Sequence, residues 1–154
     1  MNILLKDILY KVAIEAVKGS TEMTINKIEF DSRKVRGNDV FVAIRGTVSD
    51  GHDFIEKAIN LGAVVIVCDT LPEIVVSGVT YIKVRDTNSA LAFMAANFYG
   101  NPSRNLKLIG ITGTNGKTTV ASLLYQLFQK AGCKVGLLST VKIMVDESHA
   151  NSLP

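Results

Sequence analysis

Residues 110–119 read GITGTNGKTT and combine closely spaced glycines with one lysine and several threonines. Glycine lets a backbone approach a ligand closely, lysine brings a positive charge to phosphate oxygens, and a threonine hydroxyl can coordinate Mg²⁺. The strict phosphate-loop pattern requires glycine at position 111, where Ile111 stands, so this segment is a variant of that pattern. The residue types and their spacing predict a phosphate-binding loop for ATP.

The flanking sequence supplies the context that such a loop needs, because the apolar run LKLIGIT precedes it and the amphipathic run VASLLYQLFQKAG follows it. A loop between a strand and a helix points free backbone N–H groups at one spot, where the helix dipole also favours negative charge. Glycine-rich turns also occur without nucleotide, but the GKTT residues in this context argue against that alternative. We expect the following residues to bind ATP: Gly113, Thr114, Asn115, Gly116, Lys117, Thr118 and Thr119.

The pattern around the loop predicts a strand over 106–112, a helix over 117–131 and a strand over 134–139, which together form one βαβ unit. Turn-forming residues at 99–105 precede this unit. We therefore expect two α/β domains, 1–100 and 101–154. The second should be incomplete, because a single βαβ unit of about 50 residues has no neighbouring strands to extend its sheet.

The first domain alternates helical and strand patterns. We expect a short amphipathic helix over 3–11 and a helix over 54–61, for which Asp53 is a candidate cap and Asp50 a second capping residue. A third helix should start at Asp86 or Thr87 and end at Gly100. Strands are expected in IEF (28–30), DVFVAI (39–44), AVVIVCD (63–69) and VTYIKV (79–84).

Composition narrows the class of protein. The formal charge is +3, and the 17 Lys and Arg residues are mixed with 14 acidic residues, so no nucleic-acid-binding stripe is expected. Neither a secretory leader nor an apolar run long enough to cross a membrane is present in the sequence, which predicts a cytoplasmic protein. Cys68 and Cys133 are interpreted as reduced structural cysteines, and His52 as a capping or exposed histidine.

Three segments together resemble the Mur ligases, the cytoplasmic enzymes that add amino acids to the peptidoglycan precursor. They are FYGNPSRNLKLIGITGTNGKTT, DSRKVRGNDVFVAIRG and DGHDFIEKAINLGAVVIV. The TNGKTT loop is typical of the family, and the resemblance covers about residues 25–140. It implies a small UDP-binding α/β domain followed by the start of a P-loop ATPase domain.

The resemblance also implies a site for the uridine nucleotide of the precursor. The family's DSR motif places Phe30 and Ser32 at that site. A second set follows the VAIRG strand, where the family commonly has GHQxDG and this chain has GTVSDG, so Thr47, Val48 and Ser49 take the matching places. That difference removes any His or Gln side-chain contact and leaves backbone contacts. From the residues alone, 31–33 is better interpreted as an ordinary solvated turn, and the resemblance reverses that preference.

The implied reaction is ATP- and Mg²⁺-dependent amide ligation, in which Lys117 is catalytic and Thr118 binds the metal. The expected substrates are UDP-N-acetylmuramoyl-L-Ala-D-Glu and a diamino acid, either meso-diaminopimelate or L-lysine. The YGNPS segment favours the member that adds this third residue over the member that adds the terminal dipeptide, which remains an alternative. Because further family motifs and a C-terminal domain do not occur in the sequence, we expect an N-terminal portion that is inactive alone. A non-catalytic module that binds the UDP precursor or a nucleotide is the other alternative.

Overall fold

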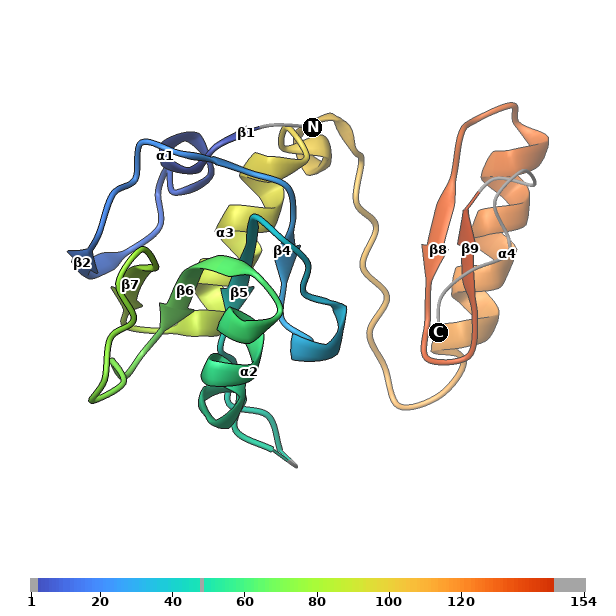
Figure 1. Cartoon of the computed structure of the whole chain (residues 1–154). Helices are drawn as coiled ribbons and strands as arrows, with labels where there is room; N and C mark the ends of the chain where they lie inside the picture. The colour runs from blue at the N-terminus through green and yellow to red at the C-terminus, as the bar shows by residue number, and fades with distance from the viewer. Residues whose placement is uncertain (1–2, 48, 146–154) are drawn as a thin grey trace. The chain divides into compact units, whose positions relative to one another are not determined.

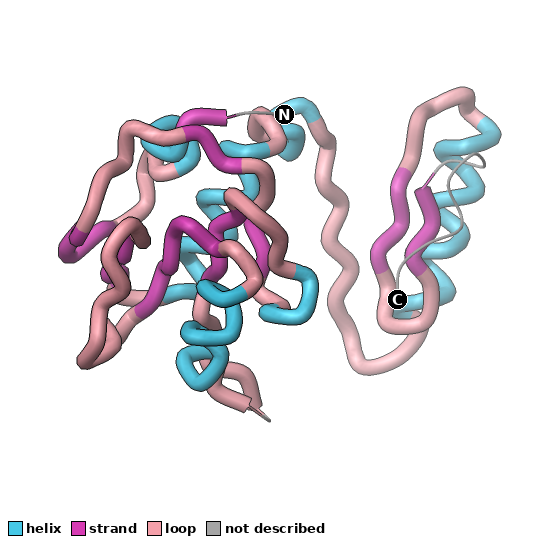
Figure 2. Tube along the Cα trace, in the orientation of Figure 1, coloured by secondary structure: helices cyan, strands magenta, loops and turns pink. Residues whose placement is uncertain are grey.

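The computed structural model describes residues 3–47 and 49–145. The chain divides into two compact units between Leu106 and Lys107. Unit 1, which precedes this point, contains a five-stranded sheet, and unit 2 contains a helix and a hairpin (Figure 1). Figure 2 shows that a long stretch without helix or strand leads from unit 1 into the helix of unit 2.

The sheet of unit 1 has the strand order β2-β7-β6-β5-β4. The strands β4, β5, β6 and β7 run parallel to their neighbours, and β2 pairs antiparallel with β7 at one edge. All four strands predicted for this domain are confirmed, whereas β2 was not predicted. The bounds are β2 (Ile14–Lys18), β4 (Ile28–Glu29), β5 (Asp39–Val42), β6 (Ala63–Cys68) and β7 (Thr80–Val84).

Alternate side chains of the central strands enter two separate cores, as the twofold period of a strand requires. Val65 and Val67 of β6 pack on one face of the sheet with helices α1 (Leu5–Ile8) and α3 (Thr87–Phe98). Ile66 and Cys68 pack on the other face with α2 (Ile55–Asn60). Unit 1 is therefore a three-layer α/β domain.

Capping explains where the helices of unit 1 begin. The carboxylate of Asp86 accepts a hydrogen bond from the backbone N–H of Asn88 at 2.9 Å, so α3 begins at Thr87 as predicted. Asp50 caps the 3₁₀ helix η2 (Gly51–Phe54) by accepting from the N–H of His52 at 2.9 Å. The predicted cap at Asp53 is wrong, because α2 follows directly on η2 and its N-cap, Phe54, has no side-chain hydrogen bond.

The predicted helix over 3–11 is wrong at both ends. Its first described residues form β1 (Ile3–Leu4), which pairs antiparallel with β3 (Thr24–Ile25). The helix that follows is only α1, and Lys11 has a left-handed φ of 64°, a conformation that cannot continue a right-handed helix. Pairing with β3 thus competes successfully with helix formation at the start of the segment.

Unit 2 contains α4 (Lys117–Lys130) and an antiparallel hairpin of β8 (Gly136–Leu138) and β9 (Ile143–Val145) (Figure 1). The predicted helix and the predicted strand after it are confirmed. The predicted strand over 106–112 is wrong, because these residues contain no strand. A strand requires a neighbour for its backbone groups, and β8 pairs with β9 instead, so the βαβ unit does not form.

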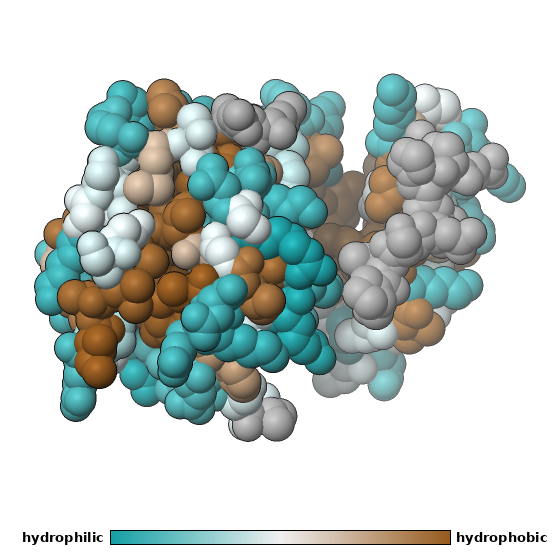
Figure 3. Space-filling view, in the orientation of Figure 1, coloured by the Kyte–Doolittle hydropathy of each residue, from teal (hydrophilic) through white to brown (hydrophobic). Residues whose placement is uncertain are grey.

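Several apolar side chains of unit 1 remain at the surface. The loop between β6 and β7 carries Ile74, Val75 and Val76, of which Ile74 is 82% exposed, and Figure 3 shows brown surface where this loop projects. Within the described residues, none of the helices combines the length and the apolar composition needed to cross a bilayer.

Candidate functional site

The glycine-rich loop ends at Gly116, the N-cap residue of α4, which has a left-handed φ of 76°. The N-cap has no side-chain hydrogen bond, and the N–H of Val120 donates to the carbonyl of Gly116 at 2.9 Å. An α-helix leaves its first backbone N–H groups without intrahelical acceptors. The start of α4 therefore presents backbone donors at the positive end of the helix dipole, which is the geometry that binds phosphate oxygens.

Lys117 lies in the first turn of α4, and its side chain is folded back over the loop. Its ammonium group donates hydrogen bonds to the carbonyl oxygen of Gly113 and, at 3.1 Å, to that of Thr114. Thr118 is half-buried, while Asn115 and Thr119 are exposed. The loop thus gathers a cation, a hydroxyl and backbone amides at one end of a helix.

The second candidate site lies at the carboxyl edge of the sheet. Since β4 and β5 are adjacent and parallel, the residues after each strand reach the same edge. Phe30 directly follows β4 and is 62% exposed, and Ser32 is buried in the 3₁₀ helix η1 (Ser32–Lys34). Thr47 and Ser49 are exposed in the turn after β5, and Val48 lies outside the described residues. The fold therefore brings the two predicted nucleotide-binding segments to one edge.

Asp31 organises the turn that carries Ser32. Its carboxylate accepts hydrogen bonds from Nε of Arg33 at 2.9 Å and Nη2 at 2.8 Å, and also from the backbone N–H of Arg33 at 3.1 Å. These bonds favour the charged carboxylate, and the side-chain bonds from Arg33 are the main reason that the pKa of Asp31 falls to about 2. The turn is therefore capped by Asp31 and carries an ion pair between Asp31 and Arg33.

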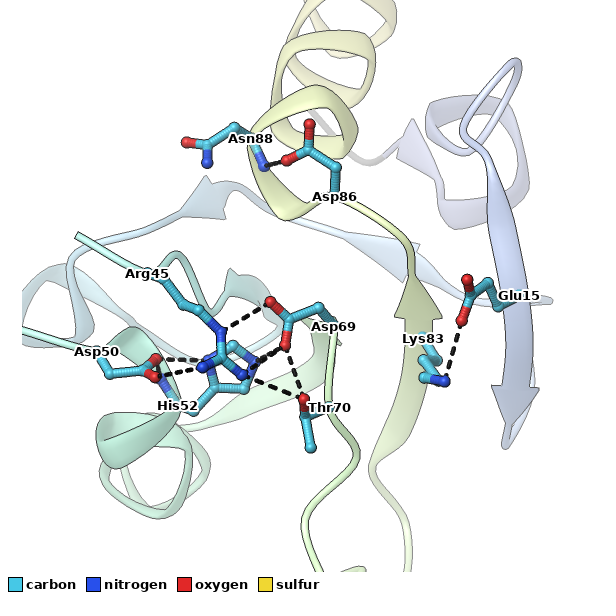
Figure 4. Close-up of polar contacts among 9 residues, drawn as sticks. All are labelled: Glu15, Arg45, Asp50, His52, Asp69, Thr70, Lys83, Asp86 and Asn88. Carbon is cyan, nitrogen blue, oxygen red and sulfur yellow. Dashed lines mark hydrogen bonds and ion pairs between the residues drawn. The ribbon is translucent and has the colours of Figure 1, made fainter. Parts of the chain in front are cut away.

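A second polar cluster lies beside the turn that joins Gly46 to Ser49 (Figure 4). Arg45 donates from Nε and Nη2 to the two oxygens of Asp69, at 3.0 and 2.9 Å, and its Nη1 lies 3.3 Å from Oδ2 of Asp50. His52 Nδ1 lies 2.6 Å from Oδ1 of Asp50. The hydroxyl of Thr70 donates to Asp69 at 2.9 Å. The cluster joins the segment after β5, the start of η2 and the end of β6.

The cluster stabilises its carboxylates in the charged form. Hydrogen bonds from the Arg45 guanidinium lower the pKa of Asp69 to about 2. The pKa of Asp50 is lowered mainly by the backbone N–H of His52, and Asp69 raises the pKa of Arg45. His52 Nε2 is buried and lies 3.2 Å from Oδ1 of Asp69, but without the geometry of a hydrogen bond.

Sequence patterns alone missed this cluster. His52 was interpreted as a capping or exposed histidine, yet its side chain is only 14% exposed. Arg45 and Asp69 are 24 residues apart in the sequence, and nothing in their local context links them. The available signal was that Arg45 directly follows one predicted strand and Asp69 ends another, since neighbouring parallel strands bring such residues to one edge.

The described residues offer no ready-made metal centre, as no group of three His, Cys, Asp or Glu side chains among them could hold an ion. Both cysteines are free. Cys68 is buried, and burial raises the pKa of its thiol to about 11, which makes it an inert core residue. Cys133 is exposed.

Family models match both parts of the chain that carry these sites. Residues 24–99, which include the turn at Ser32 and the Arg45 cluster, match the Mur ligase family, catalytic domain, and residues 111–154, which include the glycine-rich loop, match the Mur ligase middle domain. The chain belongs to the Mur ligase family.

Curated relatives of this Mur ligase chain share one name, UDP-N-acetylmuramoyl-L-alanyl-D-glutamate--2,6-diaminopimelate ligase. The Cytophaga hutchinsonii protein is 50% identical over 144 residues, which are 93% of this chain and 30% of the relative. The Clostridium tetani protein is 47% identical over 139 residues, which are 89% of this chain and 29% of the relative. The chain thus spans less than a third of the length of these relatives.

Solved Mur ligase structures resemble the fold. A structure described as UDP-N-acetylmuramoyl-L-alanyl-D-glutamate--2,6-diaminopimelate ligase has a TM-score of 0.72 at 21% identity, covering 96% of this chain and 29% of that one. MurF ligase from Thermotoga maritima, solved in complex with ADP, has a TM-score of 0.54 at 33% identity and covers 68% of this chain and 23% of that one. The mixed α/β fold with a largely parallel sheet is therefore that of Mur ligases.

Proposed function

We propose that this chain supplies the precursor-binding domain and the phosphate loop of an ATP-dependent ligase. In this proposal the enzyme adds meso-diaminopimelate to UDP-N-acetylmuramoyl-L-Ala-D-Glu in peptidoglycan synthesis in the cytoplasm. The observation that carries the proposal is the shared name of relatives that are 45 to 50% identical over most of the chain. The choice of diaminopimelate over lysine follows from the same name.

Residues 1–100 form the precursor-binding domain in this proposal, and residues 101–154 begin the ATP-binding domain. The uridine nucleotide binds at the carboxyl edge of the sheet, where Phe30 offers an exposed ring for stacking and Ser32, Thr47 and Ser49 offer hydroxyl and backbone groups. Open α/β sheets bind ligands at this edge, because loops from neighbouring strands converge there.

ATP binds with its phosphates against the start of α4. The loop residues Gly113 to Gly116 provide close backbone approach, and the first turn provides N–H donors together with Thr119. In the resting loop the ammonium group of Lys117 is held by backbone carbonyls, which are weaker partners than an anion. When ATP binds, its γ-phosphate replaces these carbonyls as the partner of the ammonium group. The ammonium group then offsets the negative charge of the phosphoryl group during its transfer.

Thr118 fits the role of a Mg²⁺ ligand, because it directly follows the lysine in the first turn of the helix. When bound, Mg²⁺ would offset the negative charge of the transferring phosphoryl group. A carboxylate is a poor acyl donor until one oxygen becomes a leaving group. Lys117 therefore acts by holding the γ-phosphoryl group while the precursor's carboxylate oxygen attacks phosphorus and ADP leaves. The amino group of the diamino acid then attacks the acyl carbon and displaces phosphate.

Three measurements test the proposal. Calorimetric titration of the 154-residue chain with UDP-N-acetylmuramoyl-L-Ala-D-Glu should detect binding that UDP-N-acetylglucosamine shows more weakly. A chimera in which this chain replaces the matching part of the Cytophaga hutchinsonii relative should form product only with ATP, Mg²⁺ and diaminopimelate. The 154 residues alone should release no ADP.

Binding by the chain combined with a folded but inactive chimera would favour a non-catalytic binding module. A chimera that accepts a dipeptide such as D-Ala-D-Ala instead of diaminopimelate would favour the terminal-dipeptide ligase. Absence of precursor binding at millimolar ligand would reject the precursor-binding role.

A further inference from the structure

Backbone hydrogen bonds join the segment after β5 to the segment that leads into η2. The N–H of Gly46 donates to the carbonyl of Ser49 at 3.0 Å, and that of Gly51 donates to the carbonyl of Ile44 at 2.8 Å. Arg45 and Asp50 form an isolated antiparallel bridge between these bonds. These bonds hold Gly46 near Ser49, and a further backbone bond from the N–H of Ala43 to the carbonyl of Val67, at 2.8 Å, ties the preceding segment to β6.

Four side chains connect this turn to the rest of the domain, and we call them the loop clamp: Arg45, Asp50, His52 and Asp69. Arg45 lies directly before Gly46 and Asp50 directly after Ser49, so these two residues stand at the base of the turn. Asp69 directly follows a different strand, β6, and it binds Arg45 through both oxygens (Figure 4). The clamp thus adds a side-chain link between Arg45, directly before Gly46, and Asp69, directly after β6.

The geometry of the clamp is more restrictive than that of an ordinary surface ion pair. A single exposed pair contributes little and leaves its side chains free to move. Here a bidentate guanidinium–carboxylate pair fixes both planes, and Thr70 and His52 contact the same carboxylate. The Asp69 side chain is only 25% exposed. Asp69 therefore fixes the orientation of Arg45, and Arg45 fixes the start of the turn.

We propose that the loop clamp, and Asp69 in particular, positions the Thr47 and Ser49 turn for the uridine nucleotide of the precursor. Because the clamp side chains are bound to one another, we assign them as positioning residues and not as ligand contacts. This inference rests on the proposed precursor-binding function. In this inference, the affinity of the site depends on the ion pair between Arg45 and Asp69, which joins the segments after β5 and β6.

The test uses Asp69→Asn in the 154-residue chain, with Glu15→Gln as a matched control. Glu15 also links two strands of the same sheet through an ion pair, 3.0 Å from Nζ of Lys83, but it joins the outer strand β2 to β7 and makes no contact with the clamp residues. Hydrogen exchange of the Gly46 amide reports the order of the turn without any ligand. Calorimetry with UDP-N-acetylmuramoyl-L-Ala-D-Glu reports the affinity.

Asp69→Asn should speed exchange of the Gly46 amide about tenfold, the factor expected when roughly one net hydrogen bond is lost. It should weaken precursor binding by a similar factor, while amides in the middle of β6 exchange as in the parent chain. Glu15→Gln should change neither quantity. Arg45→Lys should give an intermediate effect, because lysine keeps the charge but cannot form the bidentate pair.

Unchanged Gly46 exchange in Asp69→Asn would overturn the proposal, and so would equal loss of protection throughout β6, which would mean general destabilisation. Faster Gly46 exchange with unchanged precursor affinity would also overturn it. If the parent chain does not bind the precursor, the proposed function fails, whereas the Gly46 measurement still decides whether the clamp orders the turn.

Discussion

The ammonium group of Lys117 donates a hydrogen bond to the carbonyl oxygen of Thr114, 3.1 Å away, and so closes the glycine-rich loop on the helix that follows it. A second bond from the same group reaches the carbonyl of Gly113. The lysine that is expected to neutralise phosphate charge thus already points at the loop interior. In the proposed function, phosphate oxygens of ATP replace these two carbonyls as partners of the ammonium group.

Replacing Lys117 with methionine should weaken binding of MgADP and MgATP at least tenfold, because the loop loses its only side-chain cation while keeping its backbone donors. Isothermal titration calorimetry would measure both affinities. Lys130→Met, at the last residue of the same helix, is the matched control and should leave them unchanged. Equal affinity in the parent chain and Lys117→Met would contradict a role for this lysine in phosphate binding.

Gly51, two residues after Ser49, gives a separate prediction about backbone packing. A Cβ at this position would lie 2.6 Å from both the nitrogen and the oxygen of Ile44, which are backbone atoms, and the N–H of Gly51 itself donates to that oxygen at 2.8 Å. Gly51→Ala should therefore lower the free energy of unfolding by about 1–3 kcal/mol, as overpacking does elsewhere. Gly37→Ala is the control, because a Cβ there meets nothing within 4 Å. Urea denaturation of both variants would test this, and equal midpoints would refute the steric explanation.

The strongly apolar strands and the capped helix at Asp86 could be predicted because their signals are local. The strand β2 could not, since all five of its residues are exposed and its sequence IEAVK shows no buried face. The pairing of Arg45 with Asp69 also leaves no local signal in the sequence, because it depends on β5 and β6 being parallel neighbours. The error at 106–112 has the opposite origin, because an apolar run predicts a strand but cannot supply the partner that a strand needs.

Asp31 gives a prediction about pH. Its pKa is lowered from 3.8 to about 2, chiefly by the side chain of Arg33 and next by the backbone N–H of that residue. Since the folded-state pKa is depressed, this carboxylate contributes stability above pH 3.8, and the contribution is lost as pH falls through about 2. The Arg33 side chain is 78% exposed, so salt should reduce the effect.

In Arg33→Gln the pKa of Asp31 should rise toward 3.8 but stay below it, because the backbone N–H still donates. Titration of the Asp31 carboxyl carbon by NMR measures this directly. Arg85→Gln, at the end of β7, should leave the midpoint unchanged. A midpoint that stays near 2 in Arg33→Gln would mean that the backbone bond alone depresses the pKa.

Hydrogen exchange across the whole chain should separate three levels of protection. Residues 107–112 contain no helix or strand, and Leu108 is 93% exposed, so their amides should exchange at nearly the rate of an unfolded peptide. The amides of α4 from Val120 onward are in helical bonds, but the helix buries little more than Tyr125 against its hairpin, so intermediate protection is expected. The central strand β6 should be protected most, by about a hundredfold or more over 107–112. Protection at 107–112 equal to that of β6 would show that this segment pairs as a strand in solution.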